Sequence, residues 1–177
     1  MGTPGNLRNL EAVAPALAEV CRRHGARVRV VCSVEPRLPD VPVEFVRWSA
    51  EREVEDLLPL DVGLAPLLDG PRQRCKCALK SLQYMAAGLP VVTSPVGANR
   101  TVVRDGETGF HVESAGDWTR SLDRLIVDAG LRRRMGDQGR RDVETRWSFD
   151  RYAAAFESAV RGVDCAEPSG REGRGKP

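Results

Sequence analysis

The stretch DVGLAPLLDGPRQRCKCALKSLQYMAAGLPVVTS, residues 61–94, contains in order the patterns of a strand, a loop, a helix and a second strand. Its two ends, DVGLAPL and LPVVTS, are short apolar runs bounded by turn residues, which is typical of buried strands. The segment from Lys76 to Ala87 has apolar residues at helical spacing and stops before Gly88, so it predicts a helix. A helix between two short apolar strands indicates a right-handed crossover in a parallel sheet.

The same alternation continues in both directions. The elements predicted upstream are a helix over 7–23, strands over 26–34 and 42–48, and a short helix over 49–60 with Ser49 as its N-cap. Those predicted downstream are a small strand over 109–113 and three helices between 117 and 163, the last capped by Ser148. The sequence therefore predicts an α/β, Rossmann-like fold in which a parallel sheet is flanked by helices.

One domain is expected over residues 1–162, followed by a disordered tail over 163–177 that is rich in glycine, proline and charge. The chain opens with MGTPGN and a helix, so no strand precedes the first turn. We therefore expect the first strand of the sheet to be missing. Ligands of such folds bind beyond the carboxyl ends of the strands, which directs attention to the loops that follow each strand.

Composition excludes several classes of function. The chain has 27 Lys and Arg against 25 Asp and Glu, a balance that does not favour a nucleic-acid partner. It contains no run near the ~20 apolar residues of a membrane span and no signal-peptide core, so a cytoplasmic location is expected, either free or at a membrane surface. The spacing of Cys75 and Cys77 does not match a zinc site, and no metal is predicted.

The helix predicted from Lys76 carries the main candidate site. Lys76, Lys80 and Gln83 are spaced by four and three residues, which places them on one helical face. No Ser, Thr, Asp or Asn stands just before this helix to cap its free N–H groups. Two lysines beside the positive end of a helix dipole favour a bound anion such as a phosphate. The alternative is a solvated basic face whose amides are capped by water.

The segment KCALKSLQYMAAGLPVVTSPVGANRTVVRDGETGF, residues 76–110, resembles the nucleotide-sugar-binding half of family 4 retaining glycosyltransferases of the GT-B fold. The likeness extends in order over about residues 2–160. It implies the C-terminal domain of an enzyme that transfers a sugar, with retention, from a nucleoside diphosphate sugar to an acceptor such as a glycan, a lipid or a small molecule. It also implies a missing N-terminal GT-B domain, which would carry the acceptor site.

The resemblance assigns roles to individual residues. Lys76 and Lys80 would stabilise the departing diphosphate, so that no metal or other cofactor is needed. Family members carry two acidic residues that contact the sugar and the ribose, and these positions fall on Cys75 and Gln83. Gln83 can still hydrogen-bond ribose hydroxyls. The remaining donor-binding candidates are Gly2, Thr3, Arg8, Trp48, Ser49, Cys77, Ala78, Val96, Gly97 and Asn99.

Several of these assignments have simple structural alternatives. Arg8 could be an ordinary exposed residue, Trp48 could be a packing residue, and Gly97 could serve only its turn. For the whole chain, the alternative is a non-catalytic nucleotide-sugar-binding or interaction module, either a fragment or one half of a split enzyme. A nicotinamide-dependent oxidoreductase is disfavoured because GTPGN lacks the G-x-G-x-x-G pattern. We expect little catalysis from residues 1–177 alone.

Overall fold

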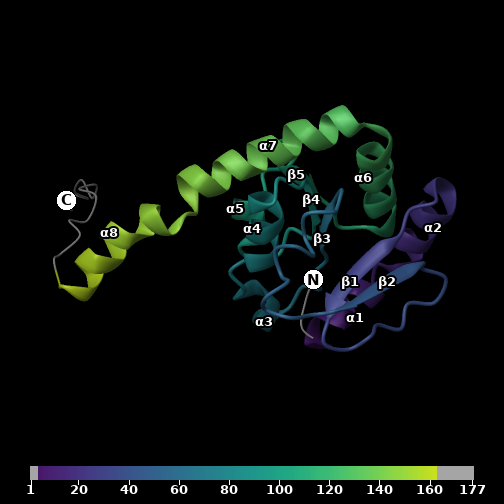
Figure 1. The fold of residues 1–177 in the computed structure, drawn as a ribbon, viewed down its shortest axis with the longest axis horizontal. Coiled ribbons are helices and arrows are strands. Elements are labelled where there is room, and N and C mark those ends of the chain that lie inside the picture. The colour runs from purple at the N-terminus through teal and green to yellow at the C-terminus, as the bar shows by residue number, and fades with distance from the viewer. Residues whose placement is uncertain (1–3, 163–177) are drawn as a thin grey trace, which may run out of the picture.

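The structure is a computed structural model that describes residues 4–162 (Figure 1). Gly2, Thr3 and the tail predicted over 163–177 lie outside the described residues. The helices are η1 Pro4–Asn6, α1 Leu7–Glu11, α2 Ala14–His24, α3 Pro71–Arg74, α4 Leu79–Ala86, α5 Asn99–Val102, α6 Ala115–Val127, α7 Ala129–Arg146 and α8 Phe149–Val160. The strands are β1 Val28–Cys32, β2 Val43–Arg47, β3 Gly63–Ala65, β4 Val91–Thr93 and β5 Gly109–His111.

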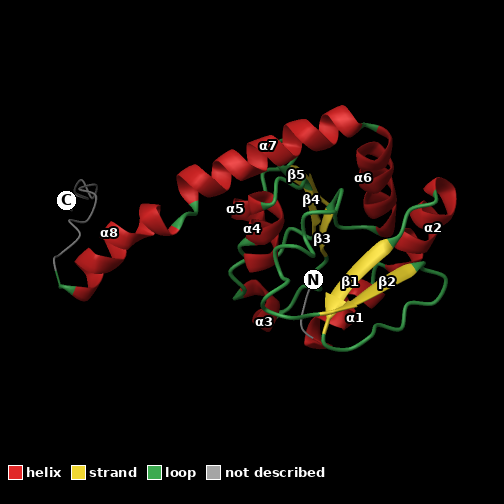
Figure 2. Cartoon of the chain, viewed as in Figure 1, coloured by secondary structure: helices red, strands yellow, loops and turns green. Residues whose placement is uncertain are grey.

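Every strand pairing in the described residues is parallel, which confirms the predicted α/β class. The strands form two sheets, however, where the sequence analysis predicted one. β1 pairs with β2 over its whole length, from Val28 opposite Val43 to Cys32 opposite Arg47. The second sheet has the order β3–β4–β5. Figure 2 shows helices α4 and α6 flanking this second sheet on opposite sides.

Two apolar clusters hold these layers together. One joins α2 and α6 to β1, β4 and β5, and Leu17 and Leu125 are among its fully buried side chains. The other lies between α4, α5 and the β3–β5 sheet, with Met85 and Val91 at its centre. Strands buried on both faces explain why VVC and PVV are continuous apolar runs rather than alternating ones.

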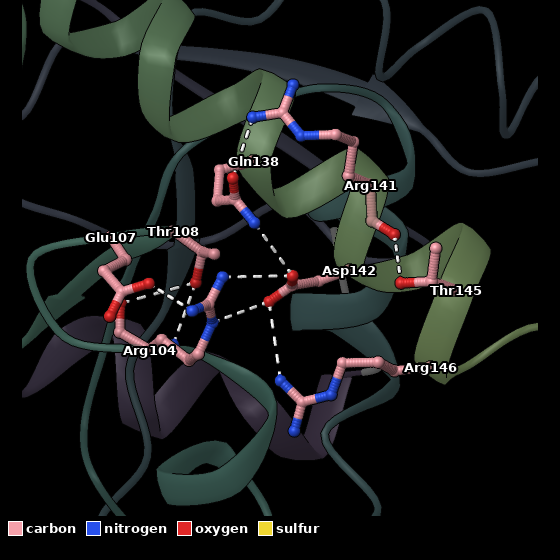
Figure 3. A network of polar contacts seen from close by, with 8 residues as sticks. All are labelled: Arg104, Glu107, Thr108, Gln138, Arg141, Asp142, Thr145 and Arg146. Atoms are coloured by element: carbon pink, nitrogen blue, oxygen red, sulfur yellow. Dashed lines mark hydrogen bonds and ion pairs between the residues drawn. The ribbon is translucent and has the colours of Figure 1, made fainter.

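Helix α7 is tied to the β5 side of the molecule by a polar network around Asp142 (Figure 3). The Arg104 guanidinium donates to both carboxylate oxygens of Asp142, at 2.8 and 3.1 Å. Gln138 donates to the same carboxylate at 3.1 Å, and Arg146 lies 3.6 Å from it. Asp142 is buried, so the hydrogen bonds and ion pairs from these partners replace the hydration that its carboxylate would have in water.

Three predicted helices differ from the structure. The helix predicted over 7–23 is broken between α1 and α2, because Pro15 has no N–H and its ring clashes with the carbonyl four residues before it. The helix predicted over 49–60 is a run of turns over 50–59. There the backbone N–H of Glu51 and the Ser49 hydroxyl bond the Glu51 carboxylate and lower its pKa, and such local bonds compete with a helix.

The third difference concerns the site-bearing helix. α4 begins at Leu79 rather than near Lys76, because Ala78 adopts a left-handed conformation with φ 56°. Lys76 therefore lies in the loop before the helix. The prediction that Lys76, Lys80 and Gln83 share one helical face is wrong. The predicted end before Gly88 is confirmed, since Gly88 has φ 74° and stops the helix.

Candidate functional site

A cavity of about 680 Å³ opens where the carboxyl ends of three strands meet the start of α4. Ser33 follows β1, Trp48 follows β2 and Leu67 follows β3, and all three residues line this cavity. We call it the donor cavity, after the ligand that the sequence resemblance implies. Its position agrees with the rule that ligands of parallel α/β folds bind beyond the carboxyl ends of the strands.

Both predicted lysines line the donor cavity even though only one is helical. The Lys76 ammonium donates to Asn6 Oδ1 at 2.6 Å, which draws η1 toward the loop before α4. Burial lowers the pKa of the Lys80 ammonium below its usual value, and the nearby Lys76 charge lowers it further. Within residues 4–162 the Lys80 ammonium has no hydrogen-bond acceptor or carboxylate partner. Burying an unpaired charge is unfavourable, so a bound anion would stabilise the charged form of Lys80.

The first turn of α4 adds hydrogen-bond donors to this positive region. Ala78 is its N-cap and supplies no side-chain hydrogen bond, as the sequence predicted for an uncapped helix. The turn contains no acidic residue. Its free N–H groups and its dipole therefore favour the same anion as Lys80 does. Cys75, Cys77 and Ala78, which the resemblance names as donor-binding candidates, also line the cavity.

Gln83 meets a carboxylate that the sequence analysis missed. Its side-chain amide donates to Glu53 Oε1 at 2.5 Å, and both residues line the donor cavity. Glu53 is 30 residues away in the sequence and was assigned to a helix that does not form. The only local signal was its place shortly after β2, in one of the loops where ligands are expected. The pair brings an acidic group into a region where the sequence pattern showed none.

The loop that follows β4 is fixed by a buried polar chain. Ser81 Oγ donates to Asn99 Oδ1 at 2.9 Å, and the Asn99 amide donates to the Ser94 carbonyl at 3.3 Å. The Leu67 N–H in turn donates to Ser94 Oγ at 3.1 Å. Asn99, a predicted donor-binding residue, lines the donor cavity, and its hydrogen bonds connect α4 to the end of β3.

Other predicted residues lie outside the donor cavity. Val96 and Gly97 line a neighbouring cavity of about 750 Å³. Gly97 has φ 58°, and a Cβ there would lie 2.6 Å from the Arg74 carbonyl oxygen, so its turn and close packing account for the glycine. Arg8 is exposed on α1, and among residues 4–162 neither it nor Ser49 belongs to the lining of the donor cavity. Trp48 lines the cavity at 43% exposure, so it is not a core residue.

Sequence comparison links this geometry to known proteins. The D-inositol 3-phosphate glycosyltransferase of Streptomyces bingchenggensis is 34% identical over 104 residues, which is 55% of this chain and 23% of that protein. The protein of the same name from Xylanimonas cellulosilytica is 32% identical over 157 residues, covering 88% of this chain and 32% of its own. The chain therefore spans about a quarter to a third of these relatives.

Structure comparison gives the same fold. The C-terminal domain of a glycosyl transferase group 1 family protein, LpcC, from Francisella tularensis superposes with a TM-score of 0.67 at 21% identity, over 84% of each chain. The family model described as "Glycosyl transferases group 1" matches residues 1–128, well over half of the sequence. The chain thus belongs to the glycosyl transferases group 1 family and has the α/β architecture of GT-B glycosyltransferases.

Proposed function

We propose that this chain is the C-terminal, donor-binding domain of a retaining GT-B glycosyltransferase that takes its sugar from a nucleoside diphosphate sugar. The observation that carries the proposal is Lys80, a partly buried cation without a counter-charge at the uncapped start of α4. A diphosphate supplies the two things that this region lacks, a negative charge and acceptors for free N–H groups.

In this proposal the donor lies along the cavity with its diphosphate against α4. Lys80, Lys76 and the first N–H groups of α4 stabilise the charge that develops on the departing diphosphate, so that no metal is required. Gln83 and Glu53 together accept from and donate to the ribose hydroxyls. The exposed indole of Trp48 lies at the edge of the same cavity, where a nucleotide base can contact it.

Transfer also needs an acceptor site, which we assign to a second GT-B domain that closes over the donor. The relatives are three to four times as long as the part that this chain spans, which supports an activity that belongs to a larger enzyme. The name of these relatives, D-inositol 3-phosphate glycosyltransferase, suggests a phosphorylated polyol as one acceptor to test. The same difference in length supports the second candidate, a nucleotide-sugar-binding module with no catalysis of its own.

Calorimetric titration of UDP, GDP and dTDP into the purified chain tests donor binding. We expect saturable binding of at least one of them, weakened about tenfold or more in Lys80→Ala. Arg133→Ala, which removes an exposed charge from α7, is the matched control and should bind as the wild type does. No binding of any nucleotide, or equal binding by Lys80→Ala, would contradict the assignment.

A transfer assay tests whether the isolated chain has any catalysis of its own. The chain is incubated with each radiolabelled UDP-, GDP- or dTDP-sugar and with inositol phosphate, and the products are separated by chromatography. Nucleotide binding without product formation is expected of both candidates, whereas turnover by the chain alone would contradict both, since each assigns no catalysis to residues 1–177 alone. Retention is tested on any product by NMR, since the anomeric configuration must match that of the donor.

A further inference from the structure

Two exposed cysteines stand two positions apart in the loop between α3 and α4. Cys75 and Cys77 both line the donor cavity, and the proposed function assigns no chemistry to either thiol. Cys21 and Cys32 are instead buried in the apolar cluster that joins α2 to β1, and burial raises the pKa of the Cys21 thiol. Reagents dissolved in water therefore reach the two loop thiols but not the two core thiols.

The spacing of the two loop cysteines suits a disulfide bond between them. One intervening residue holds their Cα atoms within about 7 Å of each other. A disulfide usually joins Cα atoms about 4.4–6.8 Å apart, so a small adjustment of the loop is enough. The segment 75–78 belongs to no helix or strand, and its backbone can adjust without breaking α3 or α4.

The loop is strained at its last residue. Ala78 has φ 56°, a left-handed conformation that alanine rarely adopts. Strain of this kind is found in segments that switch between two conformations. Ala78 directly follows Cys77 and is the N-cap of α4, which begins at Leu79. A covalent bond that moves Cys77 therefore acts on the first turn of α4.

The surroundings of the two thiols are positively charged. Lys76 lies between them in the sequence, and Lys80, whose ammonium has no carboxylate partner within residues 4–162, lines the same cavity. The first turn of α4 contains no acidic residue, so the positive end of the helix dipole is not offset. Such a region attracts anionic reagents, and glutathione disulfide carries a net negative charge.

We propose that Cys75 and Cys77 form a dithiol site, which a low-molecular-weight disulfide oxidises to an intramolecular bond that weakens anion binding in the donor cavity. One cysteine thiolate attacks the reagent, forms a mixed disulfide and expels one reagent thiolate. The other cysteine thiolate attacks the protein sulfur of the mixed disulfide, closes the Cys75–Cys77 bond and releases the second reagent thiolate. Two protein thiols are oxidised, one reagent disulfide is reduced to two thiols, and the two protons pass to the released thiolates through water.

The effect of this bond on the donor cavity rests on the proposed function. In the reduced loop the Lys76 ammonium lies 2.6 Å from Asn6 Oδ1, beside the cavity. The bond encloses the Lys76 backbone in a small ring, which turns its side chain, and it shifts Ala78 together with the N–H groups at the start of α4. Both changes remove partners of a bound diphosphate, and bonds between charged groups contribute strongly to binding.

Peptide mapping tests whether the bond forms. The chain carries Cys165→Ser, because that cysteine lies outside the described residues, and it is incubated with glutathione disulfide before unfolding and alkylation. Trypsin cleaves after Lys76, so the bond appears as two peptides, each with one loop cysteine, that are joined by a disulfide. We expect this linked pair in most chains, with the two buried cysteines alkylated. In Cys75→Ser the Cys77 thiol should instead retain glutathione as a mixed disulfide.

Calorimetric titration of pyrophosphate tests the consequence of the bond. We expect oxidation to weaken the affinity about tenfold, the scale of one hydrogen bond between charged groups, and dithiothreitol to restore it. The double variant Cys75→Ser, Cys77→Ser should bind pyrophosphate equally before and after the same oxidation.

Two results would overturn the proposal. One is glutathione adducts or bonds between chains in place of the linked peptides, and the other is equal pyrophosphate affinity of the reduced and oxidised chains. If the reduced chain bound no pyrophosphate, the proposed function and the effect on binding would both be contradicted, whereas linked peptides would still establish the dithiol site.

Discussion

At the scale of single residues, the charge of Lys80 governs the candidate site. Its pKa is lowered by burial and by Lys76, so between this lowered value and its unfolded value the unfolded chain binds more protons than the native one. The free energy of unfolding therefore rises with pH across that interval. A bound anion has the opposite effect on Lys80, because it stabilises the charged form and so raises the pKa.

This linkage predicts a pH-dependent affinity for inorganic pyrophosphate. We expect affinity to fall as pH rises through the lowered pKa of Lys80, since the site then loses one positive charge. Lys80→Arg stays charged throughout and should show only the shallow change that comes from the ligand's own ionisation. Isothermal titration calorimetry between pH 7 and pH 10 measures both. Parallel pH profiles for the wild type and Lys80→Arg would rule out Lys80 as the titrating group.

A substitution at Glu53 tests the proposed ribose contact separately from the proposed phosphate contact. Glu53→Gln preserves the shape of the side chain but removes the charge that accepts the Gln83 amide at 2.5 Å. We expect nucleoside diphosphate affinity to fall about tenfold, the usual scale for a hydrogen bond to a charged group, while pyrophosphate affinity does not fall. Glu55→Gln, in the same run of turns but more exposed, is the control. A loss of pyrophosphate binding in Glu53→Gln would mean that the turns had rearranged.

The sequence identified several residues that line the donor cavity, but it did not identify the residues that they contact. Lys80 and Gln83 were identified from their helical spacing, and Cys75 was identified from the resemblance of the same stretch to the family. Glu53 and Asn6 were missed because their contacts, with Gln83 and Lys76, span 30 and 70 residues. Such pairings depend on how the loops fold over the strand ends, and no local spacing encodes them.

At the scale of elements, the contact between α7 and α4 depends on a close backbone approach. A Cβ at Gly136 would lie 1.9 Å from the Gly88 carbonyl oxygen. We expect Gly136→Ala to lower the free energy of unfolding by about 1–3 kcal/mol or more, because the backbone at the end of α4 must shift. Urea unfolding monitored by circular dichroism measures the change.

The control for this change is Gly116→Ala in the first turn of α6. A Cβ there would meet the flexible end of Arg120 at 3.3 Å and the Ser114 hydroxyl at 3.8 Å, which is ordinary van der Waals contact. Alanine also favours the helix, so we expect a neutral effect or a gain of up to about 1 kcal/mol. If Gly136→Ala were as stable as the wild type, the approach of α7 to the end of α4 would be looser than the structure has it.

Strands were predicted more accurately than helices, for a physical reason. Each predicted strand contains an observed one, because short apolar runs between turn residues have few alternatives once they are buried. Helix boundaries depended on single residues. Pro15 divides one predicted helix, and the left-handed Ala78 delays the start of another. Alanine rarely adopts the left-handed conformation, so the sequence did not predict a helix start after Ala78.

At the scale of the whole molecule, the sequence predicted parallel strands but not their division into two sheets. Strand order and register arise from contacts between distant segments, such as the packing of α2 on α6 and of α4 on α7. Within residues 4–162, β1 and β3 do not pair with each other, so the β1–β2 pair and the β3–β4–β5 sheet are held together by side-chain packing. No helix among residues 4–162 is both long and apolar enough to cross a membrane.

Helix α8 differs from the rest of the molecule in its packing. It extends away from the main body, which Figure 1 shows, and Phe149 and Phe156 are 95% and 72% exposed. Its apolar residues recur at helical spacing, so they form one stripe that makes little contact with the two apolar clusters. Tyr152 stacks on Trp147, with ring centroids 6.5 Å apart, near the junction with the body.

A chain that ends at Ser148 tests whether α8 contributes to stability. Because α8 buries little apolar surface, we expect the shortened chain to unfold within about 2 °C of the full chain and to associate less with itself. A chain that ends at Val127 also loses α7, with its contacts to α4 and the Asp142–Arg104 pair, and it should not unfold cooperatively. Calorimetry and light scattering measure the two properties. A fall of more than about 5 °C in the Ser148 chain would show that α8 folds back onto the body in solution.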